Sequence, residues 1–289
     1  MRIELTDRGV IALEGTDAAT LLQGIVTNDL RRLGDAAEPR ALYAALLTPQ
    51  GKYLFDFFLL ADQGRILIDC RAEDREALLR RLMLYRLRAK VDIRDVSDDF
   101  RLFAQCDAVD GDVTGRQWRE DGMIVAVDPR GADLGRRYIM PRDTTVPAPE
   151  AGPEAYRRHL ILAGVPEPAL DAERERTLAL ELGLDWLNGV DFAKGCYVGQ
   201  EITARTHWRG KVRKRLLGIR FEGPPPEEGS AVAANGTAIG TICGATEGGA
   251  IALLRTETLP APALHLEDGR SAWLAERARA LLDADAKPS

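Results

Sequence analysis

Lys194-Gly-Cys-Tyr-Val-Gly-Gln-Glu201 is the stretch that says most about this chain. It places one thiol, that of Cys196, between two glycines and close to a cation, an aromatic ring, an amide and a carboxylate. A hydrophobic core does not need this mixture, whereas a loop that binds a small polar ligand or exposes a thiolate often contains it. A cation beside a thiol favours the thiolate form, which links Lys194 to Cys196.

Composition describes an ordinary globular protein. The chain has 289 residues, 45% hydrophobic and 29% charged, with a formal net charge of -6. The negative charge argues against a protein dedicated to coating nucleic acid. The N-terminal residues lack the apolar core of a signal peptide, and the longest apolar run, near 53–61, is too short to cross a bilayer. We therefore expect a cytoplasmic protein with no membrane partner.

The four cysteines lie far apart, at Cys70, Cys106, Cys196 and Cys243, and none forms a Cys-x-x-Cys pair. A closed zinc site or a complete iron–sulfur site held by one local motif is therefore not expected. If Cys196 binds a metal, the other ligands must come from a partner chain or a small thiol. The other three cysteines lie in or beside apolar runs and are expected to be structural.

Two kinds of pattern divide the chain. The first 212 residues mix strands with expected helices at 16–25, 73–87, 153–163 and 177–182, and a hairpin is expected around Thr48-Pro-Gln-Gly51. From residue 213, short alternating strands separated by Gly and Pro clusters predict a small all-β unit. We expect an α+β region over 1–212, the all-β unit over 213–283 and a flexible tail over 284–289. Motifs typical of dinucleotide, nucleoside-triphosphate and serine-hydrolase sites are absent from the sequence.

The octapeptide 194–201 resembles the signature of the YgfZ-type proteins, which are folate-binding proteins of iron–sulfur cluster assembly related to the T-protein (aminomethyltransferase) of the glycine cleavage system. Further segments are similar to that family: Leu22–Asp29, Leu47–Asp56, Glu181–Trp186 and Ala204–Leu216. The last is similar to the branch that includes the mitochondrial cluster-assembly members. The resemblance implies a T-protein-like folate-binding body of two intertwined α+β units, with a C-terminal β-barrel.

The resemblance also implies a function. It suggests a protein that binds tetrahydrofolate or a derivative and helps to assemble or repair iron–sulfur clusters in client enzymes, including radical enzymes that thiolate tRNA. The expected partners are a reduced folate and iron–sulfur carrier and client proteins, while the link to tRNA is indirect. An iron–sulfur cluster shared with a partner is the expected cargo, with Cys196 as the redox or cluster-binding thiol.

Candidate ligand contacts surround this thiol. Lys194, Gln200 and Glu201 offer groups that fix the polar edge of a pterin or hold the loop itself. Glu181 matches the acidic residue of the T-protein stretch Glu-Ala-Gly-Leu, and its carboxylate suits an aminopyrimidine edge. Asp56 interrupts an apolar strand, where a charge is costly unless it is exposed or partnered. The matching hairpin of the T-protein carries an aspartate that assists chemistry at folate.

A basic run follows the octapeptide, with six cations between residues 205 and 215. Arg205 and Arg209 are the candidates for the anionic glutamate tail of folate, since arginine pairs well with carboxylates. Trp208 is a candidate for stacking on an aromatic ligand. Two other functions stay open: a folate-dependent aminomethyl or one-carbon transferase, supported by Asp56 and Glu181, and a tRNA-binding module formed by 205–215.

Overall fold

The computed structural model describes residues 1–33, 38–145, 148–259 and 263–285. The chain forms two compact units, and each is made of two separate stretches. The first unit contains Met1–Tyr156 and Leu187–Gln200, and the second contains Arg157–Trp186 and Glu201–Ser289. Among the described residues, none of the helices combines the length and the apolar character needed to cross a membrane.

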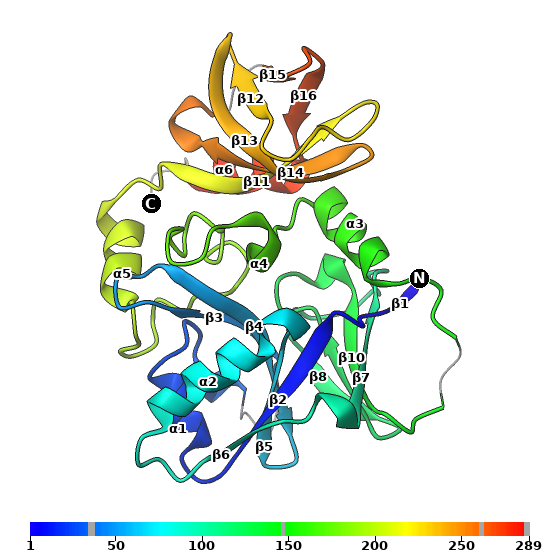
Figure 1. Cartoon of the computed structure of the whole chain (residues 1–289), viewed down its shortest axis with the longest axis vertical. Coiled ribbons are helices and arrows are strands. Elements are labelled where there is room, and N and C mark those ends of the chain that lie inside the picture. The colour runs from blue at the N-terminus through cyan, green and yellow to red at the C-terminus, as the bar shows by residue number, and fades with distance from the viewer. Residues whose placement is uncertain (34–37, 146–147, 260–262, 286–289) are drawn as a thin grey trace. The chain divides into compact units, whose positions relative to one another are not determined.

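The first unit contains two antiparallel five-stranded sheets (Figure 1). One has the strand order β3-β4-β5-β2-β6, formed by β3 (Leu42–Leu47), β4 (Tyr53–Asp62), β5 (Arg65–Arg71), β2 (Arg8–Glu14) and β6 (Asp92–Asp95). The other has the order β1-β7-β10-β9-β8, formed by β1 (Arg2–Glu4), β7 (Phe100–Gln105), β10 (Arg136–Pro141), β9 (Met123–Val127) and β8 (Gln117–Glu120).

Helices α1 (Ala18–Gln23) and α2 (Arg75–Arg86) pack on the first of these sheets. Their apolar side chains Leu22, Leu78 and Leu82 share one core with Phe57 and Ile68 of the strands. All six residues of β3 are buried, which explains why this strand reads as a continuous apolar run. Short 3-10 turns connect the elements: η1 (Leu30–Arg32), η2 (Ala72–Asp74), η3 (Ser97–Asp99) and η4 (Ala132–Leu134) in this unit, and η5 (Thr256–Thr258) in the other.

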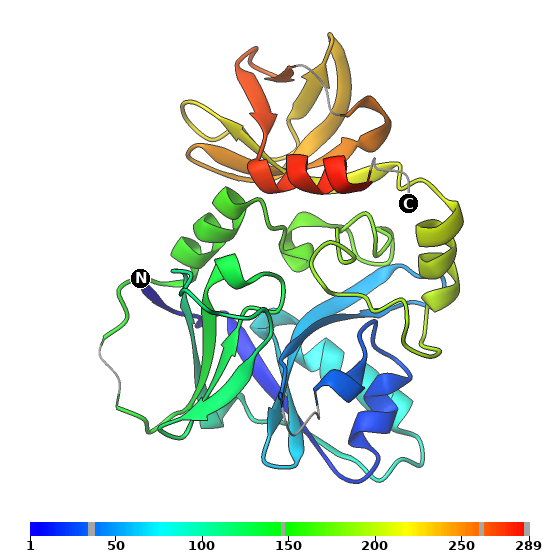
Figure 2. The same cartoon turned by 180° about the vertical axis from the view of Figure 1, so that it is seen from behind.

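The second unit is built on a closed barrel with the strand order β11-β14-β13-β12-β15-β16. Its strands are β11 (Lys214–Phe221), β12 (Ala231–Ala234), β13 (Thr237–Thr246), β14 (Gly249–Arg255), β15 (Leu264–Leu266) and β16 (Ser271–Leu274). Closure leaves no unpaired strand edge. The short helix α4 (Pro168–Asp171) packs on β13, and α6 (Glu276–Asp285) packs beside β11 (Figure 2). Two helices cross the boundary between the units in sequence, α3 (Pro153–Ala163) and α5 (Gln200–Arg209).

Several expected elements are confirmed and others are wrong. The hairpin turn at 48–51 joins β3 to β4, and the helices expected at 73–87 and 153–163 correspond to α2 and α3. The helix expected at 177–182 is a series of turns, and α5 and α6 were not expected. Asp17 precedes α1 but does not cap it with its side chain, which instead accepts the backbone N–H of Lys90.

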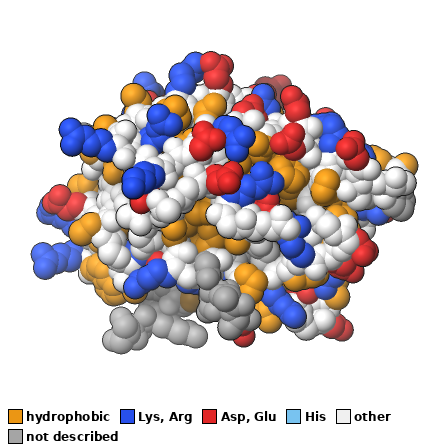
Figure 3. Space-filling view, turned by 90° about the horizontal axis from the view of Figure 1, so that it is seen from below, with side chains coloured by type: hydrophobic (Ala, Val, Ile, Leu, Met, Phe, Trp, Pro, Cys, Tyr) orange, Lys and Arg blue, Asp and Glu red, His pale blue; other side chains and the backbone are white. Residues whose placement is uncertain are grey.

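The compact units divide the chain differently from the expected regions 1–212 and 213–283, because 157–186 and 201–212 group with the barrel. Of the expected flexible tail 284–289, residues 284 and 285 belong to α6, and 286–289 lie outside the described residues. On the face of the molecule in Figure 3, acidic and basic side chains are interspersed with small hydrophobic patches. That mixture is typical of a solvated surface rather than of a surface that binds nucleic acid.

Candidate functional site

Residues 188–200, called the signature loop below, are tied to the segment that follows α1 in the first unit. The backbone N–H groups of Asp191 and Val198 donate to the carbonyl oxygens of Thr27 and Gly24, at 3.0 and 3.2 Å. The hydroxyl of Thr27, which is fully buried, donates to the carbonyl of Gly189 at 2.5 Å. These bonds join segments that are far apart in the sequence, since Thr27 and Gly189 are separated by 162 residues.

Lys194 adds three hydrogen bonds between the two segments. Its ammonium donates to the carbonyl oxygens of Gln23, Val26 and Asn28 at 2.8, 2.5 and 2.8 Å. The group also lies 4.9 Å from the ring centre of Tyr197. Burial lowers the pKa of Lys194 to about 8. An ammonium has three hydrogens, and all three are used here. Lys194 therefore stabilises the loop and does not make the ligand contact that was one of its two expected roles.

The thiol of Cys196 is exposed on this loop, whereas Cys70 and Cys106 are buried and Cys243 is half-buried. Burial raises the pKa of Cys70 to about 12 and the pKa of Cys106 and of Cys243 to about 11. These three thiols are therefore protonated at neutral pH, as expected for structural cysteines. Cys196 is the thiol that the fold presents to solvent.

The two glycines of the octapeptide have different roles. Gly199 has a φ of +86°, and a Cβ there would lie 2.6 Å from the carbonyl oxygen of Thr48 and 2.9 Å from the Cβ of Leu47. Only glycine combines this backbone conformation with so close an approach to the β3–β4 turn. A Cβ at Gly195 would meet nothing within 4 Å. The hairpin and the signature loop are thus packed together at Gly199.

The polar residues after the thiol begin helix α5. The side-chain oxygen of Gln200 accepts the backbone N–H of Tyr197 at 3.2 Å, so this amide stabilises the loop itself. Glu201, Arg205 and Arg209 are exposed, and Trp208 is 70% exposed with its ring edge-on to that of His207 at 4.5 Å. Glu201, Arg205, Trp208 and Arg209 occupy positions i, i+4, i+7 and i+8, which share one helix face.

The cations further along the basic run are not equivalent. Arg215 is 4% exposed, and its guanidinium forms a two-pronged ion pair with Asp185 at 2.8 and 2.9 Å. The same group lies 3.7 Å from the centre of the Trp186 ring. Glu181, also in the second unit, accepts the backbone N–H of Leu178 at 2.9 Å and so closes its own turn. Arg215 therefore stabilises the second unit and does not extend the exposed basic surface.

Asp56 lies half-buried on β4, where two tyrosine hydroxyls donate to it. Tyr43 reaches one oxygen at 2.9 Å and Tyr53 reaches the other at 2.6 Å. Both tyrosines are fully buried, and burial followed by the charge of Asp56 raises the pKa of Tyr43 well above its ordinary value. The apolar strand thus accommodates the charge by hydrogen bonds that orient the carboxylate.

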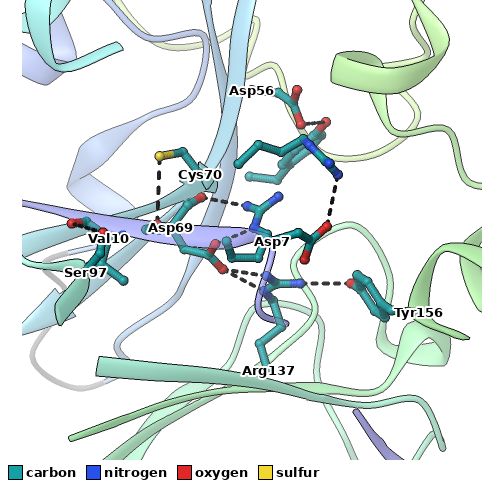
Figure 4. Close-up of polar contacts among 12 residues, drawn as sticks. Asp7, Val10, Asp56, Asp69, Cys70, Ser97, Arg137 and Tyr156 are labelled. Carbon is teal, nitrogen blue, oxygen red and sulfur yellow. Dashed lines mark hydrogen bonds and ion pairs between the residues drawn. The ribbon is translucent and has the colours of Figure 1, made fainter. Parts of the chain in front are cut away.

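A buried ionic network beside Asp56 was not expected (Figure 4). Asp69 on β5 accepts Arg8 of β2 at 2.6 Å and Arg137 of β10 at 2.5 Å, so it connects the two sheets of the first unit. Arg137 also donates to the hydroxyl of Tyr156 at 2.8 Å. The sequence carried a sign of this network, because Asp69 interrupts an apolar strand in the same way as Asp56.

The network continues through Arg130, which pairs with buried Asp128 at 2.8 Å and donates to the Tyr156 hydroxyl at 2.7 Å. The guanidinium carbons of Arg8, Arg130 and Arg137 lie 5.3, 5.0 and 3.9 Å from the centre of the Phe58 ring. Guanidinium groups bind aromatic faces well when they are removed from water. Each of these charges has an oppositely charged partner, and the pair between Arg137 and Asp69 links the two sheets.

A pocket of about 340 Å³ also opens in the first unit, beside the start of the signature loop. Its lining includes Asn28, Arg32, Arg40, Tyr43, Thr114 and Asn188. Of the candidate residues, the structure places Lys194, Cys196 and Gln200 on one loop and Asp56 on β4 of the same unit. Glu181, Glu201, Arg205, Trp208 and Arg209 belong to the second unit. Over the described ranges, no group of three or more His, Cys, Asp or Glu side chains is arranged to hold a metal ion.

The fold defines the class of protein. The crystal structure of glycine cleavage system aminomethyltransferase T from Bartonella henselae matches 95% of this chain and 84% of its own, with a TM-score of 0.73 and 16% identity. The C-terminal beta-barrel domain of CAF17 matches residues 213–275, which include the whole closed barrel. The chain therefore has the T-protein fold, mixed in α and β content, with a C-terminal β-barrel.

Sequence relatives narrow this class. The mitochondrial iron–sulfur cluster assembly factor IBA57 of Mus musculus is 34% identical over 94% of this chain and 82% of its own length. The Homo sapiens protein of that name gives the same identity and coverage. The Mycosarcoma maydis homologue is 35% identical, over 76% of this chain and 57% of its own length. The chain belongs to the IBA57 family of iron–sulfur cluster assembly factors.

These relatives correct one expectation and refine another. The expected cytoplasmic location is wrong, because the relatives are mitochondrial proteins. Membership of a cluster-assembly family with the T-protein fold is confirmed, while the finer YgfZ-type assignment stays a prediction.

Proposed function

We propose that this protein helps to assemble or repair iron–sulfur clusters in client proteins, with the Cys196 thiol as one ligand of the cluster during its transfer. The observation that carries the proposal is the exposure of Cys196 on a loop tied to the body of the first unit. One thiol supplies one ligand, so the cluster is a cargo whose other ligands come from an iron–sulfur carrier or a client protein. Membership of the IBA57 family supports this role.

The test is a Cys196→Ser substitution, with Cys243→Ser as the matched control on the barrel. Cluster-dependent enzyme activity in cells that lack the native protein and cluster transfer in vitro should both fall sharply for Cys196→Ser. The control should remain close to wild type, since Cys243 is half-buried and protonated. Wild-type activity of Cys196→Ser in both assays would remove Cys196 from the proposed role. Activity of tRNA-thiolating enzymes in the same cells tests the proposed clients.

Tetrahydrofolate or a derivative is proposed as a bound partner. The donor set fits a pterin in chemical type: Asp56 presents an oriented carboxylate, and two tyrosine hydroxyls and apolar strands surround it. A carboxylate of this kind would hold the amino-pyrimidine edge by accepting its N–H groups. Titration calorimetry with tetrahydrofolate should show binding that Asp56→Asn weakens by about tenfold. Absence of heat with the wild-type protein would contradict the folate proposal.

Aminomethyl or one-carbon transfer to folate is the second candidate function. It is favoured by the T-protein fold and by the fixed carboxylate of Asp56 on the central hairpin. Such a reaction has no need of an exposed thiol, which is why cluster assembly is preferred. Production of methylenetetrahydrofolate from an aminomethyl donor, lost in Asp56→Asn and retained in Cys196→Ser, would reverse this preference.

Direct binding of tRNA through 205–215 has less support than it had from the sequence, because Arg215 is buried in an ion pair. A gel shift that persists at physiological salt would restore it, since phosphate contacts weaken steeply with salt.

A further inference from the structure

The segment 23–28, at and just after the end of α1, presents three backbone carbonyls to one ammonium. Helix α1 ends at Gln23, and the carbonyls of residues 20–22 accept backbone N–H groups from residues 24–26. The ammonium of Lys194 supplies hydrogen bonds to Gln23, Val26 and Asn28, one from each of its hydrogens. A buried cation is expensive to desolvate, and this arrangement offsets that cost because the carbonyl dipoles point at the charge.

The loop is fastened on both sides of the thiol. Lys194 fixes it two residues before Cys196, and the backbone N–H of Val198 fixes it two residues after, by donation to Gly24. Consecutive Cα atoms are about 3.8 Å apart, so a residue two positions from an anchor has a reach of about 7 Å. Cys196 therefore lies in a short stretch of the loop, 194–198, whose two ends are both hydrogen-bonded to segment 23–28.

We propose that Lys194 is a positioning residue, which attaches the signature loop to segment 23–28 through three ammonium–carbonyl hydrogen bonds and so fixes the position of the Cys196 thiol. The effect on cluster transfer rests on the proposed function of Cys196, but the position of the loop can be measured without a cluster. The role requires lysine, because a compact ammonium fits between three carbonyls whereas the planar guanidinium of arginine does not.

The local test is the mobility of a nitroxide spin label on Cys196, in a Cys243→Ser background so that one thiol reacts. The spectrum should be restricted in the parent protein and in Lys211→Met, which removes an exposed lysine and the same charge. Lys194→Met and Lys194→Arg should both give a mobile label at temperatures where circular dichroism shows the fold intact. An unchanged line shape in Lys194→Met, or restoration by Lys194→Arg, would overturn the proposal.

A second variant keeps the proposal testable if Lys194→Met does not fold. Thr27→Val removes a hydroxyl that accepts from the N–H of Ala45 and donates to Gly189, and so loosens the same attachment without touching Lys194. It should also raise label mobility, and an unchanged spectrum would contradict a loop position set by this attachment.

Cluster transfer then tests the consequence. Lys194→Met should slow transfer by at least about tenfold, since small displacements of a reacting group are costly. If Cys196→Ser abolishes transfer and Lys194→Met leaves it at the wild-type rate, positioning by Lys194 is refuted. If Cys196→Ser is fully active, the proposed function fails while the spin-label result stands on its own.

Discussion

Burial decides what each charged side chain of the candidate site does. Lys194 and Asp56 were both candidates for contact with a polar ligand in the sequence, but their surroundings differ in the structure. The ammonium of Lys194 uses all its hydrogens on backbone carbonyls. The carboxylate of Asp56 accepts two tyrosine hydroxyls, one on each oxygen, in a half-buried position on β4. Lys194 therefore makes a structural contact, while a ligand contact of Asp56 stays a proposal.

Thiol reactivity should separate the cysteines cleanly. Iodoacetamide at pH 7.5 should modify Cys196 first, because it is exposed, while burial raises the pKa of Cys70, Cys106 and Cys243. Peptide mass spectrometry of the native protein measures the order of modification. Modification of Cys243 as fast as that of Cys196 would contradict the burial that the structure gives it.

Asp29 should make stability depend on pH in acid. Hydrogen bonds from Arg31 lower its pKa from 3.8 to about 2, so the carboxylate stabilises the fold above pH 3.8. That contribution is lost as the pH falls through 3.8 towards 2. Asp29→Asn should lower the free energy of unfolding by about 1 kcal/mol at pH 6, a value reduced for solvent screening because Arg31 is exposed, and by little at pH 2.

Urea unfolding of Asp29→Asn and of the parent protein at both pH values measures this difference. A difference in unfolding free energy that is the same at pH 6 and pH 2 would show that the ion pair does not titrate as described.

At the scale of elements, the signature loop and the β3–β4 hairpin form one packed feature, and the two glycines of the octapeptide probe it. Gly199→Ala should destabilise the protein by roughly 3 kcal/mol, because it adds a positive-φ penalty to a contact of 2.6 Å with a backbone oxygen. Gly195→Ala is the matched control and should change stability by less than about 0.5 kcal/mol, since its Cβ meets open space. Thermal unfolding of the pair decides, and equal losses would refute the distinction.

Elements were predictable where apolar runs are bounded by turn residues or where apolar residues recur at helical period. The hairpin was predicted because turn residues at 48–51 separate two apolar runs, and helix α2 was predicted because Leu78 and Leu82 share one apolar stripe. Helix α5 was not predicted from the sequence, because Thr203 is its one buried residue and no apolar stripe marks the helix. The contact of Lys194 with segment 23–28 was not predicted either, since backbone carbonyls carry no side-chain signal.

At the scale of the whole molecule, each unit has its own hydrophobic core. Leu254 is fully buried in the barrel core, and Leu254→Ala should cost about 2–5 kcal/mol. Hydrogen exchange should show faster exchange in β11–β16 and little change in the two sheets of the first unit. Equal acceleration in both units would show that they open as one cooperative body.

The T-protein fold itself was predictable, but only from the resemblance of several motifs. Alternation and turn residues predicted a β-rich C-terminal unit, and the barrel with the matching CAF17 domain agrees with that. The ion pairs of Asp69 with Arg8 and Arg137 were out of reach, because they join residues 61 and 68 positions apart and depend on how two sheets face each other. Local patterns contain no information on such pairings.

The interleaving of the two units has a consequence for how the protein is made. The first unit takes its last segment from Leu187–Gln200, after the chain has already entered the second unit at Arg157. A ribosome delivers the chain from the N-terminus, so segment 23–28 emerges well before Lys194, which follows Asn28 by 166 residues. The thiol is thus set in place only by the segment that completes the unit, and nascent chains that end before Gln200 have no finished site to load.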